Sequence, residues 1–169
     1  MGITKTGKKQ RVVFLQLRII AIGHKMPAWV TQGYQEYAKR IRGDLTLTLT
    51  EIPMQKRAKS ISSKKLAEKE GDAILAAMKP KEYLVALDLN AKMISTEKLA
   101  TQLNIWQQAG KSVALVIGGP DGLSQSLLTK ADEKIALSPM TLPHPLVRVI
   151  LAEQLYRAWS LNQGRPYHL

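Results

Sequence analysis

Cysteine is absent from the 169 residues of this chain, which excludes disulfides, thiolate catalysis and zinc–thiolate sites. Aromatic residues make up only 5% of the chain, so a broad base-stacking platform like that of RNA-recognition sheets is not expected. No apolar run approaches the roughly 18 to 20 residues of a membrane-spanning helix, and the first 14 residues lack the apolar core of a signal peptide. We expect a soluble, cytoplasmic protein with no membrane partner and no metal.

Acidic residues are also scarce. Lys and Arg outnumber Asp and Glu by 25 to 13, which leaves a formal charge of +12 and favours a polyanionic partner such as nucleic acid. The alternative is a solvated basic surface with no specific partner. The basic residues gather near the start of the chain and in a later probable loop: Lys5, Lys8, Lys9 and Arg11, then Lys56, Arg57, Lys59, Lys64 and Lys65.

The length and the composition fit one globular domain. A 45% hydrophobic and 22% charged chain of this size can bury a sizeable core, but it is too short for two ordinary domains. Residues 1–14 are basic and almost devoid of apolar periodicity, which predicts a disordered N-terminal arm. Residues 15–169 are expected to form the domain.

Apolar periodicity divides that domain into alternating strands and helices. Strands are expected at 15–22, 45–52, 83–87, 112–117 and 135–137, and helices after Pro27, at 63–79, after Ser95, at 124–131, and from Pro145 to Leu161. The alternation of Leu and Thr in 45–52 is typical of a strand near a sheet edge, and the apolar run 112–117 of a strand covered on both faces. The pattern predicts a single-domain, three-layer α/β fold: a mostly parallel sheet of about five strands with helices on both faces.

A glycine turn, residues 118–122, follows the most apolar strand. Gly118 and Gly119 leave the backbone bare at the carboxyl end of a strand, where a nucleotide-like ligand can approach closely. The spacing is neither a dinucleotide fingerprint nor a phosphate-binding P-loop. Taken alone, such a turn is more often a purely structural tight turn.

An apolar loop, residues 137–142, is the second candidate segment. It combines apolar side chains that suit an adenine ring with backbone groups that suit its edge, and it consists of Leu137, Ser138, Pro139, Met140, Thr141 and Leu142. Pro139 removes one backbone donor. His144 then stands between two prolines, where it is either a functional side chain or a helix cap at a surface joint.

Arg148 is the strongest catalytic candidate on the last helix. It shares a helical arc with Leu151, Leu155 and Trp159, and a buried arginine requires an anion or an acceptor. The alternative is an intramolecular pair with Glu153 or another carboxylate. Because apolar residues occur nearly all round this helix, we expect a second subunit to cover part of it, in a homodimer.

The chain ends in a tail, residues 162–169, in which Gly164 and Pro166 stop the helix and Tyr167 and His168 follow. An ordinary frayed terminus is the alternative to a functional tail.

Together, the glycine turn, the stretch from Ser138 to Arg148 and the tail resemble the ribosomal large-subunit pseudouridine N3-methyltransferases, a branch of the knotted SPOUT methyltransferases. The resemblance runs from about Leu15 to the C-terminus. It implies a C-terminal trefoil knot, a homodimer with active sites at its interface, and methyl transfer from S-adenosylmethionine to N3 of a pseudouridine in 23S rRNA, with the assembled ribosome as the expected substrate.

The resemblance also implies which residues act. Leu87, Gly118 and the apolar loop correspond to the cofactor site, and we add Gly119 as its neighbour in the turn. Arg148 is expected to stabilise charge on the base or to anchor a phosphate, and Tyr167 and His168 to contact the base or relay its proton, with His144 in support. The family often ends in a charged residue where this chain has Leu169.

Two other functions compete with this interpretation. A non-catalytic ribosome- or RNA-binding module would need only the basic charge. A nucleotide-dependent oxidoreductase is disfavoured because the fingerprint and its acidic ribose partner are missing.

Overall fold

A computed structural model describes residues 13–168, the last of them by its backbone alone. The prediction of a disordered arm therefore falls mostly outside the described residues. Val13 and Phe14 are described: the backbone carbonyl of Val13 accepts a hydrogen bond from Gln107 Nε2 at 2.7 Å, and the Phe14 side chain is exposed.

Five parallel strands form one sheet in the order β2-β1-β4-β3-β5. The strands are β1 (Leu15–Ile22), β2 (Leu45–Ile52), β3 (Tyr83–Leu87), β4 (Ser112–Ile117) and β5 (Glu133–Ile135). The first four agree with the expected bounds. The Leu/Thr strand β2 lies at an edge, as its alternation predicts, and the apolar strand β4 is central and buried.

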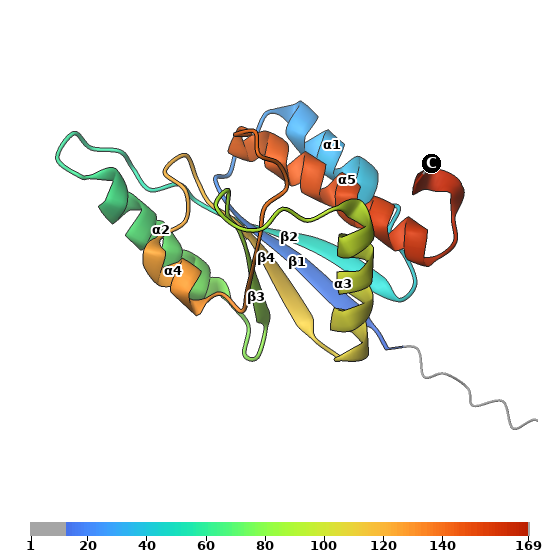
Figure 1. The fold of residues 1–169 in the computed structure, drawn as a ribbon. Helices are drawn as coiled ribbons and strands as arrows, with labels where there is room; N and C mark the ends of the chain where they lie inside the picture. Colours follow the sequence, from blue (N-terminus) through green and yellow to red (C-terminus); the bar gives the residue numbers. More distant parts are fainter. Residues whose placement is uncertain (1–12, 169) are drawn as a thin grey trace, which may run out of the picture.

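Helices cover both faces of the sheet, which confirms the three-layer α/β prediction (Figure 1). One face carries α1 (Ala28–Ala38), α3 (Thr96–Gln108) and α5 (His144–Asn162), and the other carries α2 (Ser63–Ala77) and α4 (Gln125–Lys130). Each helical layer has its own apolar core against the sheet. A short 3-10 helix, η1 (Pro166–His168), returns against α5 (Figure 1). The trefoil knot that the resemblance implies stays a prediction.

Helix starts follow the expected chemistry. Ser95 and Ser124 cap α3 and α4, their hydroxyls accepting hydrogen bonds from the backbone N–H groups of Lys98 and Leu127 at 3.2 Å. Helix α2 ends at Ala77, two residues before its expected end, with Met78 extended. Lys79 precedes Pro80, and a residue before proline avoids the helical conformation, which accounts for the earlier stop.

The position predicted for the last strand was wrong by two residues. Strand β5 pairs with β3 from Glu133 to Ile135, and Ala136 then bridges Met93 instead of extending the ladder. The apolar run that suggested a strand at 135–137 has another use, because Leu137 turns into the wall of a pocket. Within residues 13–168, no helix is both long and apolar enough to span a bilayer.

Candidate active site

A pocket opens at the carboxyl ends of β3, β4 and β5, the edge at which parallel α/β sheets bind ligands. It encloses about 630 Å³ of empty space, part of it open to solvent, and its wall is mostly apolar. A mostly apolar hollow at this edge of the sheet is the kind of place where a small molecule or a cofactor binds. The lining residues are Leu87, Asp88, Leu89, Ile117, Gly118, Gly119, Gly122, Leu123, Ile135, Ala136, Leu137, Ser138, Met140, Leu142, His144 and Val147.

The structure brings together most of the residues predicted to bind a cofactor. Leu87, both glycines of the turn, and four residues of the apolar loop line the same pocket, although they come from three different strand ends. Pro139 and Thr141 do not line it and are exposed. His144, the first residue of α5, also lines the pocket. The sequence predicted only a supporting role for His144, whereas the structure places it in the wall of the candidate cofactor site.

Backbone packing within the glycine turn explains why residue 118 is a glycine. A Cβ atom on Gly118 would lie 2.8 Å from the carbonyl carbon of Gly122 and 3.0 Å from the amide nitrogen of Leu123. Any side chain there must therefore push the turn open. The turn is closed by the amide of Gly122, which donates to the carbonyl of Gly119 at 3.0 Å, and Gly122 is the residue with a positive φ, at 77°.

The apolar loop is anchored at its base and open at its rim. The amide of Ala136 donates to the carbonyl of Lys92 at 3.1 Å, and the carbonyl of Ala136 accepts from the amide of Ile94 at 3.0 Å. The amide of Met140 donates to the hydroxyl of Ser138 at 2.9 Å. The Met140 side chain is 70% exposed at the pocket rim, an apolar surface that a ligand would cover.

Asp88 is a pocket residue that the sequence reasoning missed. It follows β3 directly, and its amide donates to the carbonyl of Ile135 at 2.9 Å, so the strand ladder holds it in place. Its carboxylate accepts from the amide of Asn90 at 3.1 Å. Asp88 is the one carboxylate among the lining residues, which also include the imidazole of His144. The sequence signal that could have identified Asp88 was its position directly after an apolar strand.

His144 is held in its neutral form. Burial, and then the positive charge of Arg148, lower the pKa of the His144 imidazole below its ordinary value. At neutral pH the ring can therefore accept a proton or a hydrogen bond at the pocket wall.

Arg148 is 1% exposed, and the anion that pairs with its guanidinium is a carboxylate of the same chain. One guanidinium nitrogen, Nη1, contacts Glu51 Oε2 at 2.7 Å, and Nη2 donates to the carbonyls of Ile22 at 2.9 Å and Gly23 at 2.6 Å. The intramolecular pair is therefore present, with Glu51 as the carboxylate, whereas Glu153 pairs with another arginine. These bonds fasten the ends of β1 and β2 to the start of α5.

The part of the tail whose side chains are described packs against the carboxyl-terminal half of α5. The Tyr167 ring contacts the Tyr156 ring with 4.6 Å between centroids, and its hydroxyl donates to Glu153 Oε1 at 3.3 Å. The guanidinium of Arg157 lies 4.9 Å from the Tyr167 centroid and pairs with Glu153 at 2.7 Å. Arg157, which the sequence reasoning did not single out, is thus the arginine beside the tail. For the side chain of His168 the structure gives no description.

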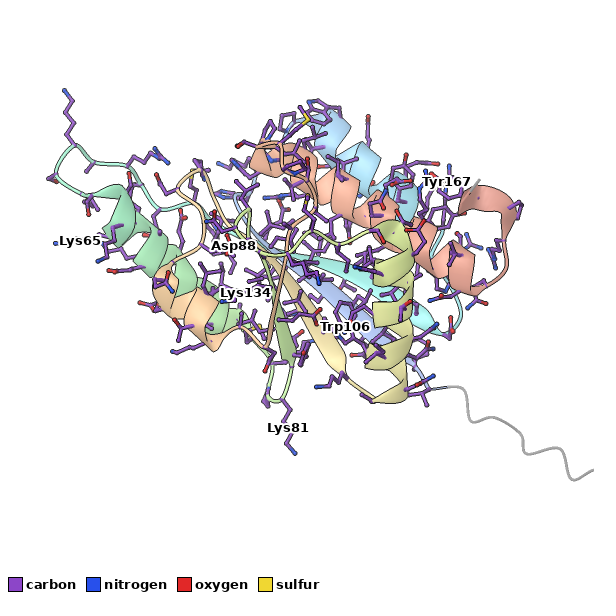
Figure 2. The ribbon with its side chains drawn as sticks, viewed as in Figure 1. Lys65, Lys81, Asp88, Trp106, Lys134 and Tyr167 are labelled. Carbon is purple, nitrogen blue, oxygen red and sulfur yellow. The ribbon has the colours of Figure 1, made fainter. Side chains whose placement is uncertain are left out.

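Burial is the main cause that raises the pKa of the Tyr167 phenol, and the nearby Glu153 carboxylate adds to it. The phenol therefore stays protonated at neutral pH and acts as a hydrogen-bond donor. The tail and the pocket lie at opposite ends of α5 in one chain: at 1.5 Å per residue, His144 and Tyr156 are separated by about 18 Å of helix. Figure 2, in which Tyr167 and Asp88 are labelled, shows this separation.

Glu70 on α2 lies directly behind the glycine turn. It is 3% exposed, its Oε1 accepts from the amide of Gln55 at 3.2 Å, and its Oε2 has no hydrogen-bond partner among the described residues. That oxygen lies 3.0 Å from where a Cβ atom on Gly119 would stand. Burial, and to a lesser degree the Asp121 carboxylate, raise the pKa of Glu70 above its ordinary value.

The raised pKa predicts that Glu70→Gln stabilises the protein at pH 8. A carboxyl whose pKa is raised on folding binds more protons in the folded state, so its cost to stability grows as pH rises through and above 4.5. We expect the variant to gain on the order of 1 kcal/mol at pH 8, with the gain vanishing below pH 4. Urea unfolding of both proteins across this pH range measures it; a gain that is independent of pH would contradict the argument.

Within residues 13–168, no group of His, Asp and Glu side chains is arranged to hold a metal ion. The pocket instead offers bare backbone, apolar walls, one carboxylate and one neutral imidazole, which suit an uncharged ring and a polar or cationic end of an organic cofactor.

Comparison with known proteins agrees with this geometry. The family model described as "Predicted SPOUT methyltransferase" matches residues 15–168. Proteins named ribosomal RNA large subunit methyltransferase H are similar along 154 residues, which cover 91% of this chain and 99% of each relative: 50% identical in Hahella chejuensis, 49% in Marinomonas sp. and 46% in Pseudomonas putida.

Solved structures share the fold at low sequence identity. A probable methylase family protein from Haemophilus influenzae has a TM-score of 0.51 and 13% identity, covering 93% of this chain and 71% of its own. A probable methyltransferase from Bordetella pertussis has a TM-score of 0.54 and 17% identity, covering 86% and 95%. The resemblance that the sequence suggested is confirmed: the chain belongs to the SPOUT methyltransferase family, whose members use S-adenosylmethionine.

Proposed function

We propose that this protein transfers the methyl group of S-adenosylmethionine to N3 of a pseudouridine in large-subunit (23S) rRNA, with the assembled ribosome as substrate in the cytoplasm. The observation that carries the proposal is the pocket at the carboxyl ends of β3, β4 and β5, walled by the glycine turn and the apolar loop in a SPOUT chain. The names of relatives up to 50% identical supply the substrate class.

The pocket fits the cofactor on its own chemistry. Leu87, Gly118, Gly119, Leu137, Ser138, Met140 and Leu142 would hold it, with Pro139 and Thr141 supporting the loop from outside. The cofactor supplies a methyl group on a sulfonium, which an in-line displacement delivers to a nucleophile without covalent help from the protein. The protein's part is to position the reactants and to exclude water.

Side chains around the pocket divide this work. His144, neutral and half-buried in the wall, is suited to accept the weakly acidic imide proton or to hydrogen-bond the base. Two of the three guanidinium nitrogens of Arg148 are bound by Glu51 and two carbonyls, and the third, Nε, is buried, so we assign Arg148 a positioning role, holding α5 against the ends of β1 and β2. At the tail, the guanidinium of Arg157 lies over the Tyr167 ring, and with Tyr167 and His168 it is our candidate for contact with the RNA.

We further propose that the active protein is a homodimer. A tail that packs on Tyr156 is about 18 Å of helix away from the pocket of its own chain, so the two meet only if a second copy contributes one of them. Half-buried apolar side chains on α5, among them Leu146, Val147 and Ile150, offer a surface for that copy. The basic residues before Leu15 would add to RNA affinity.

Mixing two inactive variants tests the shared site. We expect a tail-deleted chain and a Gly118→Val chain to regain up to about a quarter of wild-type methylation when mixed through unfolding and refolding, because a mixed dimer holds one intact pocket facing one intact tail. Methyl incorporation into ribosomes measures this. If each site were built within one chain, the mixture would stay as inactive as its components.

Titration calorimetry separates this proposal from its rival, a non-catalytic ribosome- or RNA-binding module. An enzyme of this family binds S-adenosylmethionine in the absence of RNA, whereas a pure binder has no reason to do so. Absence of binding to the folded wild-type protein would favour the rival.

A further inference from the structure

Exposed cations lie on the two loops that continue from β1 and β2, beside the candidate pocket. Lys25 follows β1, and Lys56, Arg57 and Lys59 belong to the basic loop, residues 53–62, which follows β2. The loops are joined at their base, where the amide of Gly23 donates to the carbonyl of Ile52 at 2.6 Å. Figure 1 shows the basic loop projecting beyond the helices on the α2 side.

Arg57 links the basic loop to the glycine turn. Its Nη2 pairs with Asp121 Oδ2 at 2.6 Å, and Asp121 is a residue of that turn. The Arg57 side chain is 51% exposed while that of Asp121 is 12% exposed, so the carboxylate is the fixed member of the pair. Among the described residues, Arg57 Nε and Nη1 make no hydrogen bond, which leaves donors of the guanidinium fork facing solvent.

A second contact fixes the loop from within. The amide of Gln55 donates to Glu70 Oε1 at 3.2 Å, and the other oxygen of Glu70 lies behind Gly119. The basic loop and the pocket wall are therefore held to one another by two independent contacts, through Arg57 to Asp121 and through Gln55 to Glu70. An anion bound by this loop would lie in a defined position relative to the pocket.

We propose that the basic loop and Lys25 form the docking surface for the phosphate backbone of the RNA substrate, with Arg57, oriented by Asp121, as its anchor. Arginine with free fork donors is the side chain best suited to bind a phosphate at a fixed angle. The nearby carboxylates are already engaged, Asp121 by Arg57 and Glu51 by Arg148, and Glu70 is buried. A second copy of the chain is a poor occupant, because two surfaces of like charge repel each other.

This inference rests on the proposed function for the identity of the RNA, but its test uses binding alone. A fluorescent single-stranded RNA of mixed sequence serves as the probe, without cofactor, over a range of salt. For the variant Lys56→Gln/Arg57→Gln/Lys59→Gln we expect the slope of log K against log salt to become shallower by about 2, since each lost phosphate contact removes about 0.7. The affinity for S-adenosylmethionine should stay within about twofold.

Lys81→Gln is the matched control, because Lys81 is also exposed but precedes β3, at the amino-terminal edge of the sheet (Figure 2). Its salt slope should change by much less than the roughly 0.7 that one lost phosphate contact removes. Arg57→Lys tests orientation: it keeps the charge and loses the fork, so RNA affinity should fall at least about threefold. An unchanged slope in the triple variant, or a loss of about 0.7 in Lys81→Gln, equal to the loss per residue in the triple variant, would overturn the docking surface. A wild-type protein that binds RNA through this loop but transfers no methyl group would overturn the proposed function instead.

Discussion

The variant Gly118→Val is expected to show no detectable binding of S-adenosylmethionine while remaining folded. A Cβ atom at this position would lie 2.8 Å from the carbonyl carbon of Gly122 and 3.0 Å from the amide nitrogen of Leu123, so the backbone of the turn, which lines the pocket, must shift. The branched side chain also takes up space that the cofactor requires. Titration calorimetry measures the affinity, and circular dichroism with sedimentation checks that the fold and the oligomer persist.

Two substitutions in the apolar loop give this prediction a matched pair. Leu142 lines the pocket and Thr141, its neighbour, is exposed outside it. Leu142→Asp should weaken the cofactor by at least about a hundredfold, because a carboxylate enters an apolar wall; Thr141→Asp should change the affinity by less than about threefold. Equal effects of the two substitutions, or normal binding by Gly118→Val, would show that the cofactor site lies elsewhere.

Deletion of residues 165–169 is expected to reduce methylation of ribosomes by at least about a hundredfold, the scale of losing a positioned acid–base group. The deletion removes Tyr167 from its contacts with Tyr156, Glu153 and Arg157, at the end of α5 away from the cofactor pocket. Cofactor affinity and the dimer should therefore persist. Single-turnover methylation of ribosomes, with calorimetry on the same preparation, measures both quantities.

Tyr167→Phe is the control that separates packing from chemistry. It keeps the ring against Tyr156 and removes only the hydroxyl that donates to Glu153. We expect an intermediate loss of about tenfold, because a phenol that stays protonated contributes one hydrogen bond rather than a base. A tail deletion that methylates at nearly the wild-type rate would remove the tail from the mechanism.

Sequence patterns were sufficient for most of the sheet because each strand has a distinct apolar signature. The Leu/Thr alternation of β2 suits a strand at the edge of the sheet, and the apolar run of β4 suits a strand at its centre. Both patterns are local in the sequence and can be recognised without the fold. For β5 the signature was misleading, since the apolar residues Ala136 and Leu137 serve the 92–94 segment and the pocket rather than the ladder.

The residues that line the candidate cofactor pocket were predictable as segments, whereas the partners of Arg148 were not. The glycine turn and the apolar loop are continuous stretches whose composition is compatible with a ligand, and parallel topology brings their strand ends together. The anion for Arg148 is Glu51, 97 residues away, and its other acceptors are carbonyls, which carry no sequence signal. Burial in an apolar arc predicted that a partner exists but not which group supplies it.

Long-range placement also decided the residues that were missed. Asp88, Glu70 and Arg157 are ordinary charged residues in the sequence, and only the fold sets them in the pocket wall, behind the glycine turn and against the tail. The separation of the tail from the pocket along α5 is likewise a property of the folded chain. The apolar faces of α5 already predicted a dimer, and this separation adds a second reason, because the tail of one chain does not reach the pocket of the same chain.

Mass spectrometry of 23S rRNA from a strain that lacks this protein tests the central claim most directly. We expect a single pseudouridine to lose its N3-methyl group, and expression of the wild-type chain, but not of Gly118→Val, to restore it. Unchanged methylation of every pseudouridine in the deletion strain would contradict the account.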